Sequence, residues 1–219
     1  MRVLLLPGTL CDAALWSGVR LPPAAHVWPV VQGRTLTDAA LHAVTGHPGP
    51  LHVVGFSLGA IVAFEVLRLW PERVRQLTLI SANPLAPTAA QLAAWADQAV
   101  AAATGPDGFE GVARQVAMGA GAHSSKVLAM ARQVGAATFL EQLALLRARP
   151  DSRPTLQGYR GPLTLLVGTA DPITPPSLTE MMAQVAPQAD VRVVPEAGHY
   201  LPLDAPEAVS ALFRTWAYA

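Results

Sequence analysis

Residues 51–69 read LHVVGFSLGAIVAFEVLRL, and this stretch decides the fold. Its first part, Leu51 to Val54, is nearly continuous in apolar residues, which is typical of a strand buried on both faces. Its last part, Leu58 to Leu69, has a helical pattern that ends before Pro71. Between them, Gly55-Phe56-Ser57-Leu58-Gly59 places a serine at the turn. The stretch therefore predicts a strand, a tight turn and a helix.

Other short apolar runs along the chain resemble that first strand. They are Val3–Leu6, His26–Val31, Leu77–Ile80, Leu163–Val167 and Val191–Val194. Helical patterns occur between or after them, at Thr37–Val44, Ser177–Val185 and Pro206–Trp216. Because apolar strands that alternate with helices indicate a parallel sheet covered on both faces, the sequence predicts an α/β fold with a mostly parallel sheet of about six strands.

One long interval departs from this alternation. Between Ile80 and Leu163 no strand pattern occurs, whereas alanine-rich amphipathic segments do. These segments are Thr88–Ala103, Phe109–Met118, Ser125–Val134 and Ala137–Ala148. We therefore expect a core made of residues 1–84 and 156–219, with residues 85–155 inserted as a helical cap.

Composition limits the classes of protein to consider. Apolar residues make up 52% of the 219 residues and charged residues 14%, which excludes a disordered chain. Fifteen basic residues balance fifteen acidic ones, so the sequence predicts a small uncharged partner and no attraction to nucleic acid. Apolar stretches fall far short of the ~20 residues that span a bilayer, so we expect no membrane association and a cytoplasmic location.

A serine hydroxyl is a weak nucleophile unless a histidine removes its proton and an acid orients that histidine. His199 follows the predicted strand Val191–Val194, and Asp171 follows the predicted strand Leu163–Val167, so both belong at the same edge of the sheet as Ser57. Glu196 and Asp204 are rivals for the acid, because both lie near His199. The chain order of serine, aspartate and histidine favours Asp171.

Attack by the serine on a carbonyl group also requires fixed N–H donors for the developing oxyanion. The backbone N–H of Leu58, directly after the serine, is one candidate. The loop after the first strand supplies the other, for which we predict the N–H of Thr9. Cys11, the single cysteine, lies in the same loop but lacks a turn that would present it as a nucleophile.

Together these motifs resemble the α/β-hydrolase superfamily, and within it the small, cap-bearing, esterase-like members. The residues that carry the resemblance extend over nearly the whole chain. They are Leu4–Thr9 with Trp16, Gly55–Gly59, Pro71–Val74, Gly168–Asp171 with Pro175, Gly198–His199 and Pro206–Val209. The resemblance implies Ser57 as nucleophile, His199 as base, Asp171 as acid, Thr9 and Leu58 as oxyanion donors, and no metal or other cofactor.

The chain departs from the family pattern in three places. Pro7-Gly8 stands where many relatives have His-Gly, and the segment after the second strand is shortened to Gln32-Gly33-Arg34. The family's two N-terminal antiparallel strands have no counterpart, which leaves His26–Val31 as an edge strand interrupted by Pro29. We expect this edge to be blunted by the proline or used in a homodimer, so the protein is a monomer or a homodimer.

The leading hypothesis is a serine hydrolase that cleaves small, uncharged acyl esters through an acyl-enzyme intermediate. Apolar side chains expected to line its substrate pocket are Leu10, Trp95, Met118, Phe139 and Tyr200. Thioesterase, lactonase, C–C bond hydrolase and perhydrolase chemistry use nearly the same residues, and a non-catalytic receptor that keeps the pocket is a further alternative. A nucleotide-binding protein is disfavoured, because no phosphate-binding glycine motif follows a predicted strand.

Overall fold

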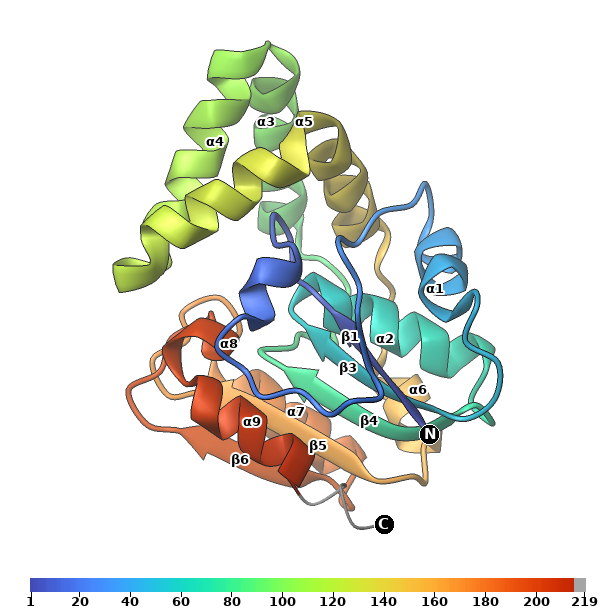
Figure 1. The fold of residues 1–219 in the computed structure, drawn as a ribbon. Helices are drawn as coiled ribbons and strands as arrows, with labels where there is room; N and C mark the ends of the chain where they lie inside the picture. The colour runs from blue at the N-terminus through green and yellow to red at the C-terminus, as the bar shows by residue number, and fades with distance from the viewer. Residues whose placement is uncertain (215–219) are drawn as a thin grey trace.

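The computed structural model describes residues 1–214 and contains one parallel six-stranded sheet within that range (Figure 1). Its strands lie in the order β2-β1-β3-β4-β5-β6, and every neighbouring pair is parallel. The strands are β1 (Arg2–Leu6), β2 (Ala25–Val27), β3 (Leu51–Phe56), β4 (Val74–Ile80), β5 (Leu163–Gly168) and β6 (Asp190–Val194). The predicted α/β fold is confirmed, and so is the predicted number of strands.

The edge strand β2 is shorter than the sequence predicts. It ends at Val27, and the last backbone contact with β1 is the hydrogen bond from the Trp28 N–H to the Leu5 carbonyl, at 2.9 Å. Pro29 has no N–H with which to continue the ladder, so pairing stops where the proline approaches. The prediction of a strand reaching Val31 was therefore wrong by several residues.

The helix that follows Ser57 is the centre of the core. In α2 (Leu58–Leu69) every residue from Leu58 to Leu67 is buried, because the helix packs against β1, β3 and β4 and is covered by α1, α5 and α6. The carboxylate of Glu65 is stabilised within this core by Arg68 at 2.6 Å and by the Thr37 hydroxyl at 2.9 Å.

The remaining helices cover the sheet or lie above it. Those around the sheet are α1 (Leu36–Val44), α6 (Arg153–Gly158), α7 (Pro176–Val185), α8 (Leu201–Asp204) and α9 (Pro206–Arg214), together with the short helix η1 (Ala13–Trp16). The predicted last helix extends to Trp216, which lies outside the described residues. No helix within residues 1–214 combines the length and the apolar character that crossing a bilayer requires.

Three long helices stand together above the sheet in Figure 1: α3 (Ala89–Ala103), α4 (Pro106–Met118) and α5 (Ser124–Ala148), with η2 (Gly121–His123) before the last. Gly135 interrupts α5 with a φ of 78°, which explains why the sequence pattern divides there into two segments. The boundary expected at residue 155 falls inside α6, which packs against α2 and α7.

Two glycines permit the close contact between α2 and the strands. A Cβ on Gly59 would lie 2.1 Å from the Leu6 carbonyl oxygen, and a Cβ on Gly55 would lie 2.5 Å from the Gly59 carbonyl oxygen. Both separations are far below any real contact, and the neighbouring atoms are backbone, which cannot turn aside. Helix α2 therefore begins directly against the ends of β1 and β3.

We predict that Gly59→Ala lowers the free energy of unfolding by at least about 2 kcal/mol, because the new methyl group forces the backbone apart. Gly111→Ala is the matched control, since this helical glycine is exposed and has open space around it. That control gains about 0.5–1 kcal/mol from helix propensity. Equal stability of the two variants in urea unfolding contradicts the close-contact explanation.

Candidate active site

The turn between β3 and α2 holds Ser57 in a strained conformation. Its φ is 52° and its ψ is −113°, outside the regions that residues with a side chain normally adopt. Such a conformation costs about 1–3 kcal/mol and persists only where the surroundings impose it. Here the Ser57 N–H donates to the Ile80 carbonyl at 3.0 Å, and the side chain makes no helix-capping bond. The hydroxyl group is thus left free for other partners.

The strain is not confined to Ser57. Among residues 1–214, positive φ outside glycine occurs at Leu10, Ser57, Ser81 and Glu196. These four residues follow the carboxyl ends of β1, β3, β4 and β6, respectively. Strained backbone is concentrated at sites where side chains must be positioned for function. The strain therefore indicates a functional site at this edge of the sheet, independently of any sequence motif.

The structure brings Ser57, His199 and Asp171 together in one chain of hydrogen bonds. The His199 Nε2 lies 3.1 Å from the Ser57 Oγ, and its Nδ1 lies 2.9 Å from the Asp171 Oδ2. His199 and Asp171 are both buried, at 6% and 3% exposure. These distances meet the geometric requirement for a nucleophile, its base and the group that orients the base.

Thr174 completes the surroundings of Asp171, and the sequence analysis did not find it. The backbone N–H groups of Ile173 and Thr174 donate to Asp171 Oδ1, each at 2.8 Å, and the Thr174 hydroxyl donates to Oδ2 at 2.7 Å. Burial raises the pKa of Asp171, but hydrogen bonding and charge from His199 and the Thr174 bonds outweigh it and leave the pKa below its usual value. Asp171 is therefore a carboxylate at neutral pH.

The two rival acids have other surroundings. Asp204 accepts the Gly198 N–H at 2.9 Å and lies 3.3 Å from the His123 imidazole. Glu196 is exposed, and its own N–H donates to the Thr169 hydroxyl. Hydrogen bonding to the His199 ring thus favours Asp171 over both.

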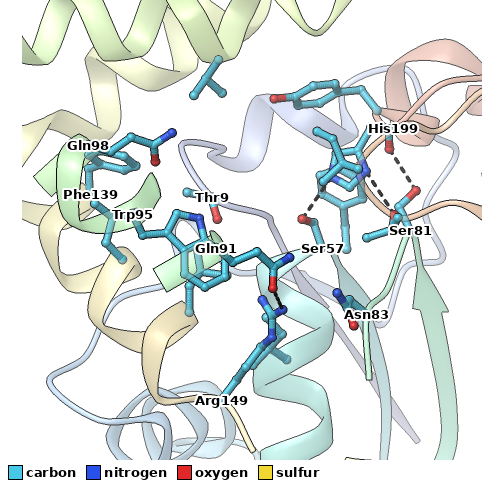
Figure 2. A pocket seen from close by; sticks show the side chains of 18 residues that line it. Thr9, Ser57, Ser81, Asn83, Gln91, Trp95, Gln98, Phe139, Arg149 and His199 are labelled. Atoms are coloured by element: carbon cyan, nitrogen blue, oxygen red, sulfur yellow. Dashed lines mark hydrogen bonds between the residues drawn. The ribbon is translucent and has the colours of Figure 1, made fainter. Parts of the chain in front are cut away.

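The loop after β1 brings a backbone donor beside the serine. In this loop the Cys11 N–H donates to the Gly8 carbonyl at 3.2 Å, and the Leu10 N–H donates to the Gln142 Oε1 at 2.9 Å. Within residues 1–214 the Thr9 N–H has no hydrogen-bond partner, and Thr9 lines the cavity next to Ser57 (Figure 2). The Leu58 N–H is the first of α2, where helical N–H groups lack intrahelical partners.

Gln142 is a second residue that the sequence analysis did not find. Its side chain is fully buried, accepts from the Leu10 N–H and donates to the Val31 carbonyl at 2.8 Å. It therefore holds the loop after β1 and the loop after β2 to helix α5. A glutamine within an apolar helical stripe is the sequence signal that could have pointed to it, because a buried amide needs partners.

A small cavity of about 190 Å³ opens on Ser57 and His199 (Figure 2). Of the predicted pocket residues, Trp95, Phe139 and Tyr200 line it. Two of the predictions were wrong. Met118, at the end of α4, is 71% exposed, and the Leu10 side chain is fully buried in the core. Among the polar residues that line the cavity, Thr9, Ser57 and His199 were predicted. The polar lining residues that were not predicted are Ser81, Asn83, Gln91, Gln98, Arg149 and Thr174.

Cys11 and His52 do not compete for the chemistry. Burial and the nearby Asp12 charge raise the pKa of the Cys11 thiol to about 12, so it stays protonated. Burial lowers the pKa of His52 to about 3, so its ring is neutral within β3, with Nε2 2.9 Å from the Thr78 hydroxyl. The part of the chain that the structure describes has no cluster of three or more His, Cys, Asp or Glu side chains that could hold a metal ion.

Comparison with known proteins identifies the family. Residues 46–206, most of the chain, match the sequence model of the family described as alpha/beta hydrolase fold. The chain belongs to the α/β-hydrolase fold family. An esterase from Thermogutta terrifontis, solved with malate bound, is a structural relative of this α/β-hydrolase. The two are 25% identical with a TM-score of 0.82, and the match covers 100% of this chain and 89% of the other.

Curated sequences similar to this α/β-hydrolase match over shorter stretches. A pimeloyl-[acyl-carrier protein] methyl ester esterase of Methylococcus capsulatus is 32% identical over 96 residues, which are 38% of this chain and 37% of the other. The dihydrolipoyllysine-residue acetyltransferase component of the acetoin cleaving system of Pseudomonas putida is 32% identical over 185 residues, which are 73% of this chain and 43% of the other. The chain thus spans about two fifths of the length of each of these relatives.

We predict that Gln142→Leu exposes the loop after β1 to faster amide hydrogen exchange and lowers the free energy of unfolding by about 2 kcal/mol, because the Leu10 N–H and the Val31 carbonyl lose their buried partner. Gln188→Leu is the control, since it removes one side-chain amide bond, to the Tyr159 carbonyl at 2.7 Å, from an exposed residue away from the site. Unchanged exchange of residues 8–12 in Gln142→Leu contradicts the assignment of Gln142 as the support of this loop.

Proposed function

We propose that this protein is a serine hydrolase that cleaves a small carboxylic ester through an acyl-enzyme intermediate. The observation that carries the proposal is the continuous hydrogen-bond chain from the Ser57 Oγ through His199 to Asp171, 3.1 and 2.9 Å in its two steps. Ser57 and His199 line a cavity that Thr9 also lines. A nucleophile, a base and oxyanion donors around a single small space are what acyl transfer requires.

In the first step the Ser57 Oγ bonds to the ester carbonyl carbon while His199 Nε2 takes the hydroxyl proton. The carbonyl oxygen becomes an oxyanion that the N–H groups of Thr9 and Leu58 stabilise. When the bond to the alcohol oxygen breaks, His199 returns the proton to that oxygen and the alcohol leaves. Water then repeats the sequence on the acyl-enzyme, with His199 as base and then acid, and releases the carboxylic acid and free Ser57.

The surroundings of His199 suit it to this role. The ionised Asp171 accepts a hydrogen bond from the Nδ1–H of His199, so Nε2 is the nitrogen that faces Ser57 as an acceptor. The rings of Phe56 and Tyr200 pack against the imidazole, with centroids 5.2 and 5.6 Å away, and the Ser81 hydroxyl donates to the His199 carbonyl at 2.9 Å. These contacts restrict the ring to the orientation that reaches the serine.

Ester hydrolysis is favoured over the alternatives by the relatives, which include an esterase structure and a methyl ester esterase sequence. Thioesters, lactones, activated C–C bonds and peracids could in principle meet the same nucleophile. A receptor without catalysis needs no base beside its serine, so the intact hydrogen-bond chain favours an enzyme.

We predict that Ser57→Ala lowers kcat for short p-nitrophenyl esters by at least about 10⁴-fold, because covalent attack is lost. Asp171→Asn has a loss of similar order, since an amide can hold the wrong histidine tautomer. Ser125→Ala, on an exposed turn of α5, keeps wild-type kcat and is the matched control.

A panel of esters, thioesters and lactones of varied acyl length, run with the same variants, ranks the reaction types. Full esterase activity in Ser57→Ala contradicts the proposal. Labelling by a fluorophosphonate separates an enzyme from a receptor, because only an activated serine reacts. Absence of labelling in the folded wild-type protein supports the receptor instead.

A further inference from the structure

Arg149 lies in the wall of the cavity that contains Ser57 (Figure 2). It stands at the end of α5, where the chain leaves the upper helices, and only 5% of it is exposed. A guanidinium group remains charged at any physiological pH, so this position brings a largely buried positive charge to the wall of the cavity. Burial lowers the pKa of Arg149, which reflects the cost of desolvating that charge.

No carboxylate of residues 1–214 neutralises this charge. The neighbouring acid Asp151 pairs with Arg153 instead, and no ion pair of Arg149 occurs. Its protein partners are neutral: the Leu85 carbonyl accepts from Nε at 2.8 Å, and the Gln91 Oε1 accepts from Nη2 at 3.0 Å. The guanidinium carbon also lies 5.1 Å from the centre of the Trp95 ring. Buried charges are normally paired, so an unpaired one beside a cavity indicates a ligand of opposite charge.

Donor groups in the cavity wall remain unused. Within the described range Nη1 of Arg149 forms no hydrogen bond with the protein. The side-chain oxygens of Asn83 and Gln91 already accept hydrogen bonds from backbone N–H groups. The NH₂ group of each amide therefore points away from that bond. Figure 2 shows Gln91 between Arg149 and Ser57 in that view, and Asn83 to the right of them, below Ser57. These groups together present only N–H donors, which is the arrangement that binds a carboxylate.

The rest of the cavity agrees with this charge. Within the described part of the chain its lining residues include no aspartate, no glutamate and no second arginine or lysine. Arg149 therefore places a positive charge in the wall of the substrate cavity, whatever the net charge of the whole chain. A zero net charge, on which the expectation of an uncharged substrate rested, is a sum over the whole chain and does not describe this space.

We propose that Arg149 binds a free carboxylate of the substrate, so that the ester cleaved at Ser57 is a short one carrying a negative charge, such as the half-ester of a small dicarboxylic acid. This proposal rests on the proposed function, since it names the substrate class of the same site. Arg149 binds the carboxylate through its free Nη1, and this holds the ester carbonyl at Ser57. The expectation of an uncharged ester is thereby replaced.

A purely structural role gives a different expectation. The two bonds to Leu85 and Gln91 fasten the end of α5 to the beginning of the upper helices. If that were the whole role, loss of Arg149 would weaken hydrolysis of charged and uncharged esters equally. The two roles are therefore separated by comparing substrates that differ in charge alone.

The kinetic test uses methyl hydrogen succinate, glutarate and adipate, each beside the uncharged ester in which a carboxamide replaces the carboxylate. Wild-type protein is expected to favour the charged member of at least one pair by tenfold or more in kcat/KM. Arg149→Met is expected to lose about 30-fold or more on that charged ester, and less than threefold on its uncharged counterpart. Arg147→Met is the matched control, because it removes an exposed charge from the same helix. Equal losses on both esters, or no wild-type preference in any pair, overturn the proposal.

Calorimetric titration of folded Ser57→Ala with the same pairs needs neither turnover nor an Arg149 variant. The charged ester of the preferred length is expected to bind at least tenfold more tightly than its carboxamide, and equal binding overturns the proposal. Tighter binding of the charged ester without turnover by wild-type protein retains the carboxylate site and contradicts the hydrolase. Turnover by wild-type protein without any preference for the charged ester retains the hydrolase and contradicts the carboxylate site.

Discussion

The close contact of α2 with β1 and β3 is the constraint on which the site depends. Because Gly59 has no side chain, the first turn of α2 lies against the Leu6 carbonyl, and the chain must turn sharply at Ser57 to reach it. This turn forces the positive φ of the serine and lifts its hydroxyl from the sheet toward His199. It also brings the loop after β1 beside the start of α2, so two sets of backbone N–H groups converge. One steric condition thus positions both the nucleophile and the candidate oxyanion donors.

The upper helices also contact the loops around the candidate site. Gln142 of α5 holds the loop that carries the Thr9 N–H, so the geometry of this candidate oxyanion donor depends on a helix distant in sequence. Arg149, at the end of the same helix, brings the charge that we assign to substrate recognition. Shifting α5 would therefore change rate and specificity together, because the two groups share one rigid element.

The sequence predicts the fold together with Ser57, Asp171 and His199, because the local sequence patterns around these residues agree with one another. The motif around Ser57 has a strand pattern before it and a helix pattern after it, and chain order selects Asp171 and His199. The residues that the sequence did not reveal act over long distances. Gln142 meets Leu10 across 132 positions, and no local pattern encodes such a partner. Periodicity likewise shows that a helix has an apolar stripe but not which member faces the cavity, so Met118 was misplaced.

The most direct test of the account is to trap the acyl-enzyme. Rapid acid quenching of the protein during turnover of p-nitrophenyl acetate, followed by peptide mass analysis, identifies the residue that carries the acyl group. The account predicts an acetyl group on the peptide that contains Ser57, absent in Ser57→Ala and strongly reduced in a His199→Ala variant. An acetyl group on another residue, or turnover equal to that of wild type in Ser57→Ala, would contradict it.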